Sequence, residues 1–265
     1  MELGLKGKIA LVSGGSKGMG RGAAEELARE GAHVLILARG QDAIDETVAA
    51  IRAEGGVAEG LSADMTDPEA IAGAVEYCKE RLGRDPDIAV ANVYGTARLN
   101  FDTATTDDFR AGYDLIVLSA MYLARAVVPG MKARGWGRIV TIGSFCVKKP
   151  HWHIPLIVDN VTRAGAAALN KSLSNELGGH GITVNTVAPG FIATEMALAW
   201  MAELAREQGQ DPAAAAAALD ATIPLKRQGT SEEIGATVAF LCSQRASYIT
   251  GQVVMVDGGL VGTPY

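Results

Sequence analysis

Residues 13–20 read Ser-Gly-Gly-Ser-Lys-Gly-Met-Gly and follow the aliphatic run Ile9–Ser13 directly. Glycines at a strand-to-helix turn let the backbone come close to a pyrophosphate, and the free N–H groups of the next helix then face that anion. The stretch therefore predicts a dinucleotide site at the start of a β-α-β unit, with a merely tight turn as the alternative. The residues expected around the phosphates are Gly14, Ser16, Lys17, Gly18, Met19 and Gly20.

Beyond this turn, short aliphatic runs alternate with longer amphipathic stretches. This alternation is typical of a parallel sheet with helices on both faces, and we predict an α/β, doubly wound, Rossmann-type sheet of seven strands. The predicted strands are Ile9–Ser13, His33–Ala38, Val57–Ser62, Ile88–Ala91, Arg138–Ile142, Thr183–Val187 and Val253–Asp257. The predicted helices are Met19–Glu30, Asp42–Glu54, Pro68–Leu82, Thr106–Arg134, Thr162–Leu177 and Glu232–Leu241.

The domain organisation follows from the absence of any composition break that would mark a linker. We predict one dinucleotide-binding and catalytic domain over residues 1–265. The exception is an Ala-rich insertion at about 194–222, in which Glu195–Glu207 and Pro212–Ala221 read as amphipathic helices. Such a pair suits a mobile flap over a substrate, and a fixed helical hairpin is the alternative. Local signals mark two helix starts, Thr66 and Asp67 as possible caps before Pro68, and a capping box of Thr230 with Glu233.

Composition excludes several classes of protein. Lys plus Arg is 24 and Asp plus Glu is 30, so the formal charge is −6, which disfavours a nucleic-acid partner. The 48% hydrophobic content excludes disorder. Three separated cysteines without a C-x-x-C pair indicate a reducing compartment. The N-terminus lacks a signal-peptide pattern, and the apolar run from Leu115 to Pro129 contains Arg125 and is short for a bilayer, so we expect a cytoplasmic protein without a membrane partner.

The glycine spacing is G-x-x-x-G-x-G, and in this the chain resembles the short-chain dehydrogenase/reductase family. The resemblance extends nearly from end to end. Asp64, followed by Met65, matches the acid that contacts adenine in that family, and Asn92 falls in the motif after the fourth strand. Residues 185–194 match the segment that holds the nicotinamide end, with Pro189, Gly190, Ile192 and Thr194 as the expected contacts. The resemblance also implies a homotetramer or homodimer.

The choice between NAD and NADP is a matter of charge after the second strand. NAD sites place an acidic residue there for the ribose 2′-OH, and NADP sites place a cation. The strand ends Leu37-Ala38-Arg39, and the first acid is Asp42. With Lys17 as a second cation, the sequence favours NADP(H) through charge-assisted bonds to the 2′-phosphate. Two solvated surface charges are the alternative.

The catalytic positions match the family only in part. Ser144 matches its serine, whereas Ile116, Asp159 and Arg163 stand at the positions of its Asn, Tyr and Lys. No Tyr in the chain has a Lys four residues later. Asp159 and Arg163 are spaced for a helix ion pair worth about 0.3–0.5 kcal/mol. In a functional reading Arg163 contacts the ribose or an anionic substrate, and Asp159 is not the acid because an adjacent Arg favours the ionised carboxylate.

Replacement proton donors occur in two loops. The segment after Ser144 contains Lys149, His151 and His153, which the family fold places beside the substrate. An exposed polar loop without a role is the alternative for them, and a metal is disfavoured because no third ligand is evident for the His-x-His pair. Tyr94 stands where the family has a Gly, and it either packs or reaches the reacting oxygen.

Two functions remain open from the sequence. The first is an NADP(H)-dependent oxidoreductase that acts on a carbonyl/alcohol pair of a small molecule, such as a ketone or a 3-oxoacyl compound, with an atypical proton donor. The second is an NADP(H)-binding protein without redox activity, either a pseudo-enzyme or regulator or a lyase-like enzyme. An enoyl-type reductase is a weaker third reading, since the lysine of those enzymes is absent as well.

Overall fold

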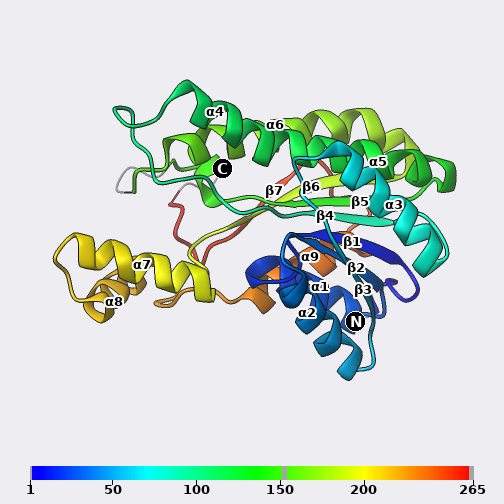
Figure 1. Cartoon of the computed structure of the whole chain (residues 1–265), viewed down its shortest axis with the longest axis horizontal. Coiled ribbons are helices and arrows are strands. Elements are labelled where there is room, and N and C mark those ends of the chain that lie inside the picture. Colours follow the sequence, from blue (N-terminus) through cyan, green and yellow to red (C-terminus); the bar gives the residue numbers. More distant parts are fainter. Residues whose placement is uncertain (1, 151–153, 263–265) are drawn as a thin grey trace.

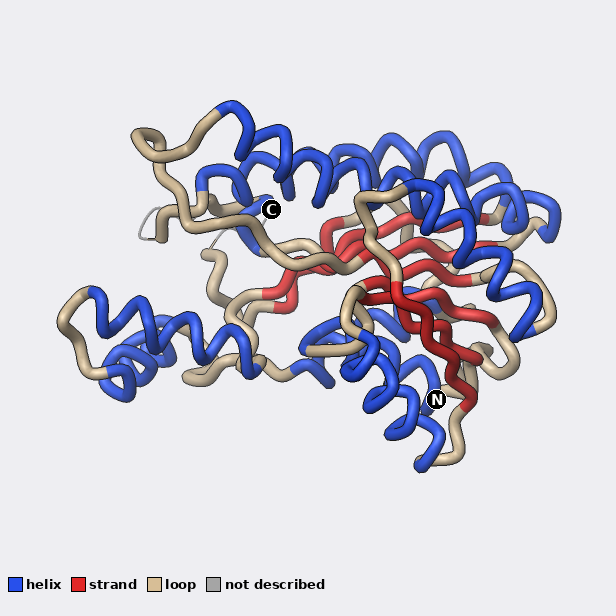
Figure 2. Tube along the Cα trace, viewed as in Figure 1, coloured by secondary structure: helices blue, strands red, loops and turns tan. Residues whose placement is uncertain are grey.

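The computed structural model describes residues 2–150 and 154–262, and a seven-stranded parallel sheet forms its centre (Figures 1 and 2). The strand order is β3-β2-β1-β4-β5-β6-β7. The order changes direction between β1 and β4, and such switch points are where open α/β sheets bind ligands. The predicted Rossmann-type fold is thus confirmed. The strands are β1 (Ile9–Ser13), β2 (His33–Ala38), β3 (Val57–Ser62), β4 (Ile88–Ala91), β5 (Gly137–Ile142), β6 (Ile182–Pro189) and β7 (Val253–Val256).

Helices cover both faces of the sheet (Figure 1). Alternate residues of β1 enter two separate cores, Val12 packing with Leu27 of α1 and Leu11 with Leu123 of α5. This alternation explains why the central strands are apolar on both sides. One face carries α1 (Gly18–Arg29), α2 (Gln41–Ala53) and α9 (Ser231–Cys242); the other carries α3 (Pro68–Leu82), α4 (Thr106–Tyr113), α5 (Ser119–Arg134) and α6 (Ile157–Leu177).

A continuous helical stretch runs from Thr106 to Arg134. It begins at a capping box of Thr105 with Asp108, and a π-helical segment, Asp114–Leu118, joins α4 to α5. By length and composition alone this stretch could cross a membrane, and 44% of its most apolar window is buried in the fold. This helical stretch is longer than the apolar run from Leu115 to Pro129. The short length of that run was one reason for expecting no membrane span.

Most predicted boundaries agree with the structure to within two residues. Asp67 caps α3 by accepting from the Glu69 N–H over 2.9 Å, and Thr230 with Glu233 forms the predicted capping box of α9. The prediction for α6 was wrong at its start, since the helix begins at Ile157 and not at Thr162. The sequence pattern missed this first turn because it buries the polar Asp159, which apolar periodicity does not register.

The insertion forms the two predicted helices, α7 (Glu195–Glu207) and α8 (Pro212–Thr222). Figure 1 shows them to one side of the sheet, beyond the carboxyl end of β6. Within these two helices Ala205 is the single buried residue. We call α7 and α8 the flap.

Candidate active site

The turn after β1 depends on glycine at two positions. Gly14 has a φ of +56°, and a Cβ there would lie 2.6 Å from the carbonyl oxygen of Asn92. A Cβ on Gly20 would lie 2.1 Å from the carbonyl oxygen of Gly14. Asn92 fixes the turn, because its Nδ2 donates to that same carbonyl over 3.2 Å and its backbone N–H donates to Ser13 Oγ over 2.9 Å. The glycines thus allow close packing of turn, helix and β4.

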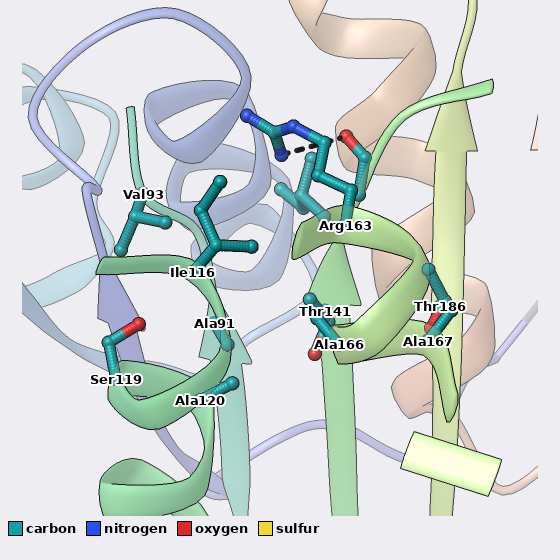
Figure 3. Close-up of a pocket in the computed structure, with 12 residues that line it drawn as sticks. Ala91, Val93, Ile116, Ser119, Ala120, Thr141, Arg163, Ala166, Ala167 and Thr186 are labelled. Atoms are coloured by element: carbon teal, nitrogen blue, oxygen red, sulfur yellow. Dashed lines mark hydrogen bonds between the residues drawn. The ribbon is translucent and has the colours of Figure 1, made fainter. Parts of the chain in front are cut away.

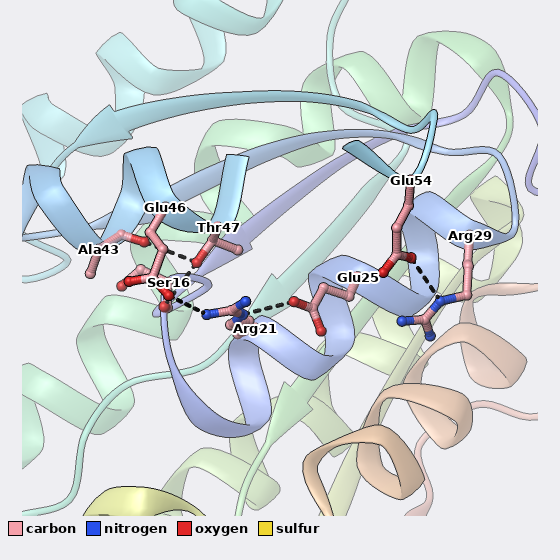
Figure 4. A network of polar contacts seen from close by, with 8 residues as sticks. All are labelled: Ser16, Arg21, Glu25, Arg29, Ala43, Glu46, Thr47 and Glu54. Carbon is pink, nitrogen blue, oxygen red and sulfur yellow. Dashed lines mark hydrogen bonds and ion pairs between the residues drawn. The ribbon is translucent and has the colours of Figure 1, made fainter. Parts of the chain in front are cut away.

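The first turn of α1 has no side-chain cap. Lys17 occupies the N-cap position in an extended conformation and makes no capping hydrogen bond. The Ser16 carbonyl is held by Thr47, whose Oγ1 lies 3.0 Å from it (Figure 4). Arg21 contacts Glu25 on its own helix over 2.7 Å and connects α1 to α2 by contacting Glu46 over 3.1 Å. The leading N–H groups are therefore open to an anion, as the residues of a pyrophosphate site require.

The predicted ribose and adenine residues follow β2 and β3. Lys17 and Arg39 are exposed, and neither forms an ion pair with a described residue. Asp64 Oδ1 accepts from the N–H and the hydroxyl of Thr66, both over 2.8 Å, and these bonds lower the pKa of Asp64. The Met65 side chain is buried in the core, so only its backbone is available to a ligand.

The segment after β6 returns to the glycine turn. A Cβ on Gly190 would lie 2.8 Å from the Cα of Asp257. Position 190, directly after Pro189 ends the strand, therefore has no room for a side chain. Ile192 is buried, and Thr194 caps α7 by accepting from the Ala197 N–H over 3.1 Å. Thr194 also faces the glycine turn, with its Cγ2 3.3 Å from the Cβ position of Gly18. The structure thus brings these two predicted cofactor segments together.

Asp159 and Arg163 form the predicted ion pair on the first turns of α6 (Figure 3 shows Arg163). Arg163 Nε lies 3.4 Å from Asp159 Oδ1, and the two side chains are only 11% and 12% exposed. The same carboxylate oxygen accepts from the Thr96 N–H over 3.2 Å. Arg163 Nη1 donates in turn to the Gly143 carbonyl over 3.4 Å, at the end of β5. The pair therefore joins α6 to two neighbouring segments.

Gly95 lies directly against this pair. A Cβ added to it would be 2.8 Å from Asp159 Oδ2 and 3.5 Å from Arg163 Nη2. Neither Gly95 nor Thr96 was predicted to take part in this site. The one signal in the sequence was the glycine that follows Tyr94. A glycine there allows the loop to pass close to a neighbouring helix.

A small pocket of about 10 Å³ lies beside Arg163 (Figure 3). Ile116 lines it from the π-helical segment, and Ser119, Thr141 and Thr186 contribute hydroxyl groups. Ile116 has no polar side-chain atom, so it contributes no hydrogen bond to this pocket. A π-helical turn at this position is a common mark of functional sites.

The structure describes some of the candidate proton donors and not others. Tyr94 is 54% exposed. Lys149 is exposed just beyond the short helix Phe145–Val147. Ser144 precedes that helix, and its Oγ accepts from the Cys146 N–H over 3.3 Å. His151 and His153 lie outside the described residues.

The amino-acid sequence is similar to a known protein family and to known proteins. A family model described as enoyl-(acyl carrier protein) reductase matches residues 14–261. The chain is 36% identical over 259 residues to the 3-oxoacyl-(acyl-carrier-protein) reductase FabG of Pseudomonas aeruginosa, covering 97% of this chain and 98% of that protein.

Solved structures show the same likeness. L-sorbose reductase from Gluconobacter frateurii, complexed with NADPH and L-sorbose, superimposes with a TM-score of 0.92 at 34% identity, over 99% of this chain and 100% of that one. YwfH, an NADPH dependent reductase involved in bacilysin biosynthesis, gives 0.90 at 30% identity, over 97% and 99% of the two chains.

Proposed function

The chain belongs to the short-chain dehydrogenase/reductase family, and from that premise we propose that it is an NADP(H)-dependent oxidoreductase. Its substrate is a small molecule with a carbonyl/alcohol pair, a ketone or a 3-oxoacyl compound. The observation that carries this proposal is a contact between two segments that are distant in sequence. Gly18 in the glycine turn lies close to Thr194 at the start of the flap. It supports a cofactor held between the carboxyl ends of the strands and a substrate beneath the flap.

The residues present fit the dinucleotide. The uncapped start of α1 offers free N–H groups to the pyrophosphate, and Lys17 and Arg39 are available to the 2′-phosphate. Asp64 would accept from the adenine, and Pro189, Gly190, Ile192 and Thr194 would border the nicotinamide. When bound, NADPH supplies the hydride.

The chain must supply the proton that balances the hydride. Asp159 is a poor donor, because its carboxylate is ion-paired with Arg163 and accepts from the Thr96 N–H. The Arg163 guanidinium acts as a fixed positive charge and not as a proton donor. We assign the proton to the hydroxyl of Tyr94, which is exposed and directly precedes Gly95 in the chain, and we assign Ser144 to orient the substrate oxygen. Lys149 and His153 are the alternative donors.

The test is a comparison of two tyrosines in the purified protein. NADPH oxidation is followed with a panel of sugar ketones, aromatic ketones and 3-oxoacyl thioesters. Tyr94→Phe is expected to lower kcat about 10²- to 10⁴-fold, the usual contribution of a positioned general acid. Tyr113→Phe removes a similarly exposed hydroxyl from α4 and is expected to leave kcat unchanged. An unchanged Tyr94→Phe enzyme would contradict the assignment and turn attention to Lys149→Ala and His153→Ala.

A second candidate function follows from the expectation that residues of other types stand at the catalytic positions of the family. An NADP(H)-binding protein without redox activity would bind NADPH tightly and consume none of it with any member of the panel. A lyase-like enzyme would turn over substrate without net NADPH loss. Product analysis by mass spectrometry separates these two outcomes from the proposed reductase.

We also propose how the protein is organised. One domain over 1–265 would carry both cofactor and substrate sites, with a mobile flap at about 194–222. The family suggests a cytoplasmic homotetramer or homodimer. Light scattering on the purified protein measures the assembly directly, and a monomer at micromolar concentration would contradict it.

A further inference from the structure

The flap has little buried surface to hold it in place. Ala205 is the one buried residue of α7, and α8 has none. Met196 and Leu198, at the start of α7, are 48% and 44% exposed. Segments with so few buried apolar contacts open locally at a small cost in free energy. Specific contacts with the body of the protein therefore decide whether the flap stays closed.

Arg98, from the loop after β4, makes such contacts. Its Nη1 and Nη2 donate to Glu207 Oε2 and Oε1 over 2.9 and 3.0 Å, a bidentate arrangement. Nη2 also lies 3.9 Å from Glu203 Oε2, and the guanidinium carbon lies 5.7 Å from the ring centroid of Trp200. The three partners repeat every three or four residues, so they share one face of α7. Bidentate pairs are the stronger class of charge-assisted hydrogen bond.

The loop that carries Arg98 is also fixed on its other side. Thr96 donates its N–H to Asp159 on α6, and Tyr94 lies two residues before Thr96. The loop thus spans from the Asp159–Arg163 pair to the flap. Leu99, next to Arg98, also accepts from the Ile157 N–H over 3.1 Å, so opening of the flap would remove one of several attachments of this loop.

We propose that Arg98 is a positioning residue, and that its contacts with Trp200, Glu203 and Glu207 form a latch that closes the flap and fixes the Tyr94 loop. The catalytic part of this inference rests on the function proposed above. The latch itself is a set of contacts within the folded protein, so it can be observed without enzymatic turnover. Because its charged partners are half-exposed, salt weakens it.

Hydrogen exchange of the full-length protein measures the latch directly. Arg98→Ala is expected to speed exchange of the amides in 195–222 about two- to fivefold, which corresponds to the loss of an exposed ion pair. The amides of α1 are expected to keep their rates, which shows that the variant is folded. Arg110→Ala removes a guanidinium whose partner, Asp107, lies on the same helix, and should leave the flap unchanged.

Charge reversal then tests the pairing itself. Arg98→Glu should open the flap further, because it repels Glu203 and Glu207. Adding Glu207→Arg keeps the original net charge of the group and should bring the flap amides back toward wild-type exchange rates. Failure of this double variant to recover, or wild-type exchange in Arg98→Ala, would overturn the latch.

Steady-state kinetics separate the latch from the proposed function. With a working carbonyl substrate, Arg98→Ala should raise its KM about two- to fivefold while the affinity for NADPH stays constant. About 1 M NaCl should raise the wild-type KM toward that of Arg98→Ala, whose own KM should respond little. An equal salt response in both proteins would contradict the latch. Normal flap protection with no turnover on any substrate would count against the proposed function alone.

Discussion

The backbone N–H of Thr96 donates to Asp159 Oδ1 over 3.2 Å, and so joins the loop after β4 to the first turn of α6. The two residues are 63 positions apart in sequence. This link depends on the carboxylate at position 159. Gly95 lies against the same carboxylate, since a Cβ added to it would be 2.8 Å from Asp159 Oδ2.

Asp159→Asn tests what the charge at this join contributes. The amide oxygen can still accept from Thr96, but Arg163 loses its ionic partner in a site that is nearly closed to solvent. We expect the free energy of unfolding to fall by about 1–3 kcal/mol, measured by urea denaturation. Asp107→Asn, in an exposed ion pair with Arg110, is the control and should change stability far less. Equal stability of Asp159→Asn and wild type would show that the pair is not structural.

Gly95→Ala tests the close approach of the loop. Its new Cβ would be 2.8 Å from Asp159 Oδ2, so the loop must shift away from α6 and the Thr96 hydrogen bond must lengthen or break. We expect a loss of stability of about 1–3 kcal/mol. Gly73→Ala, on α3 with no atom within 4 Å of the new Cβ, should instead stabilise the protein by about 0.5–1 kcal/mol. Thermal denaturation of both variants gives the comparison.

Arg39→Ala tests the choice of cofactor. Loss of a charge-assisted bond to the 2′-phosphate should weaken NADPH binding about 10- to 100-fold and leave NADH binding nearly unchanged. Lys17→Ala should act in the same direction, and Arg110→Ala should have no effect on either cofactor. Titration calorimetry with both cofactors measures this. Equal losses for NADPH and NADH would mean that the two cations do not recognise the 2′-phosphate.

Glu233 makes stability depend on pH. Its pKa is lowered from 4.5 to about 2, because Arg227 donates to the carboxylate and the Thr230 N–H does so as well. A lowered pKa in the folded state stabilises the protein above the unfolded pKa, and this contribution is lost as pH falls from about 4.5 toward 2. Glu233→Gln should therefore flatten the decline of unfolding free energy in that window. The side chain is 42% exposed, so solvent screening limits the effect to about 1 kcal/mol.

Denaturant titrations at several pH values provide the measurement. Glu80→Gln, on the exposed side of α3, is the matched control and should keep the wild-type slope. A Glu233→Gln protein with the wild-type slope would show that the Arg227 contact is absent in solution.

The sheet was predictable because its signals are local. Aliphatic runs, the turn at Gly14 and helix starts such as Thr230 with Glu233 each depend on a few adjacent residues. The Asp159–Arg163 ion pair was predictable for the same reason, as its members are one helical turn apart.

The remainder of the site depends on contacts between distant segments. The hydrogen bond from Thr96 to Asp159 and the latch from Arg98 to Glu207 have no local signature, since single charged residues are common on any surface. The first turn of α6 was missed because the residue buried there is charged. Packing between elements, which sequence periodicity does not encode, supplies these features.

The most direct test of the central claim uses NADPH that carries deuterium at the transferable C4 position. The protein is incubated with this cofactor and each carbonyl of the substrate panel, and the products are analysed by mass spectrometry. The account predicts an alcohol product that has gained one deuterium for each NADPH consumed. Tight NADPH binding with no deuterium in any product would contradict it.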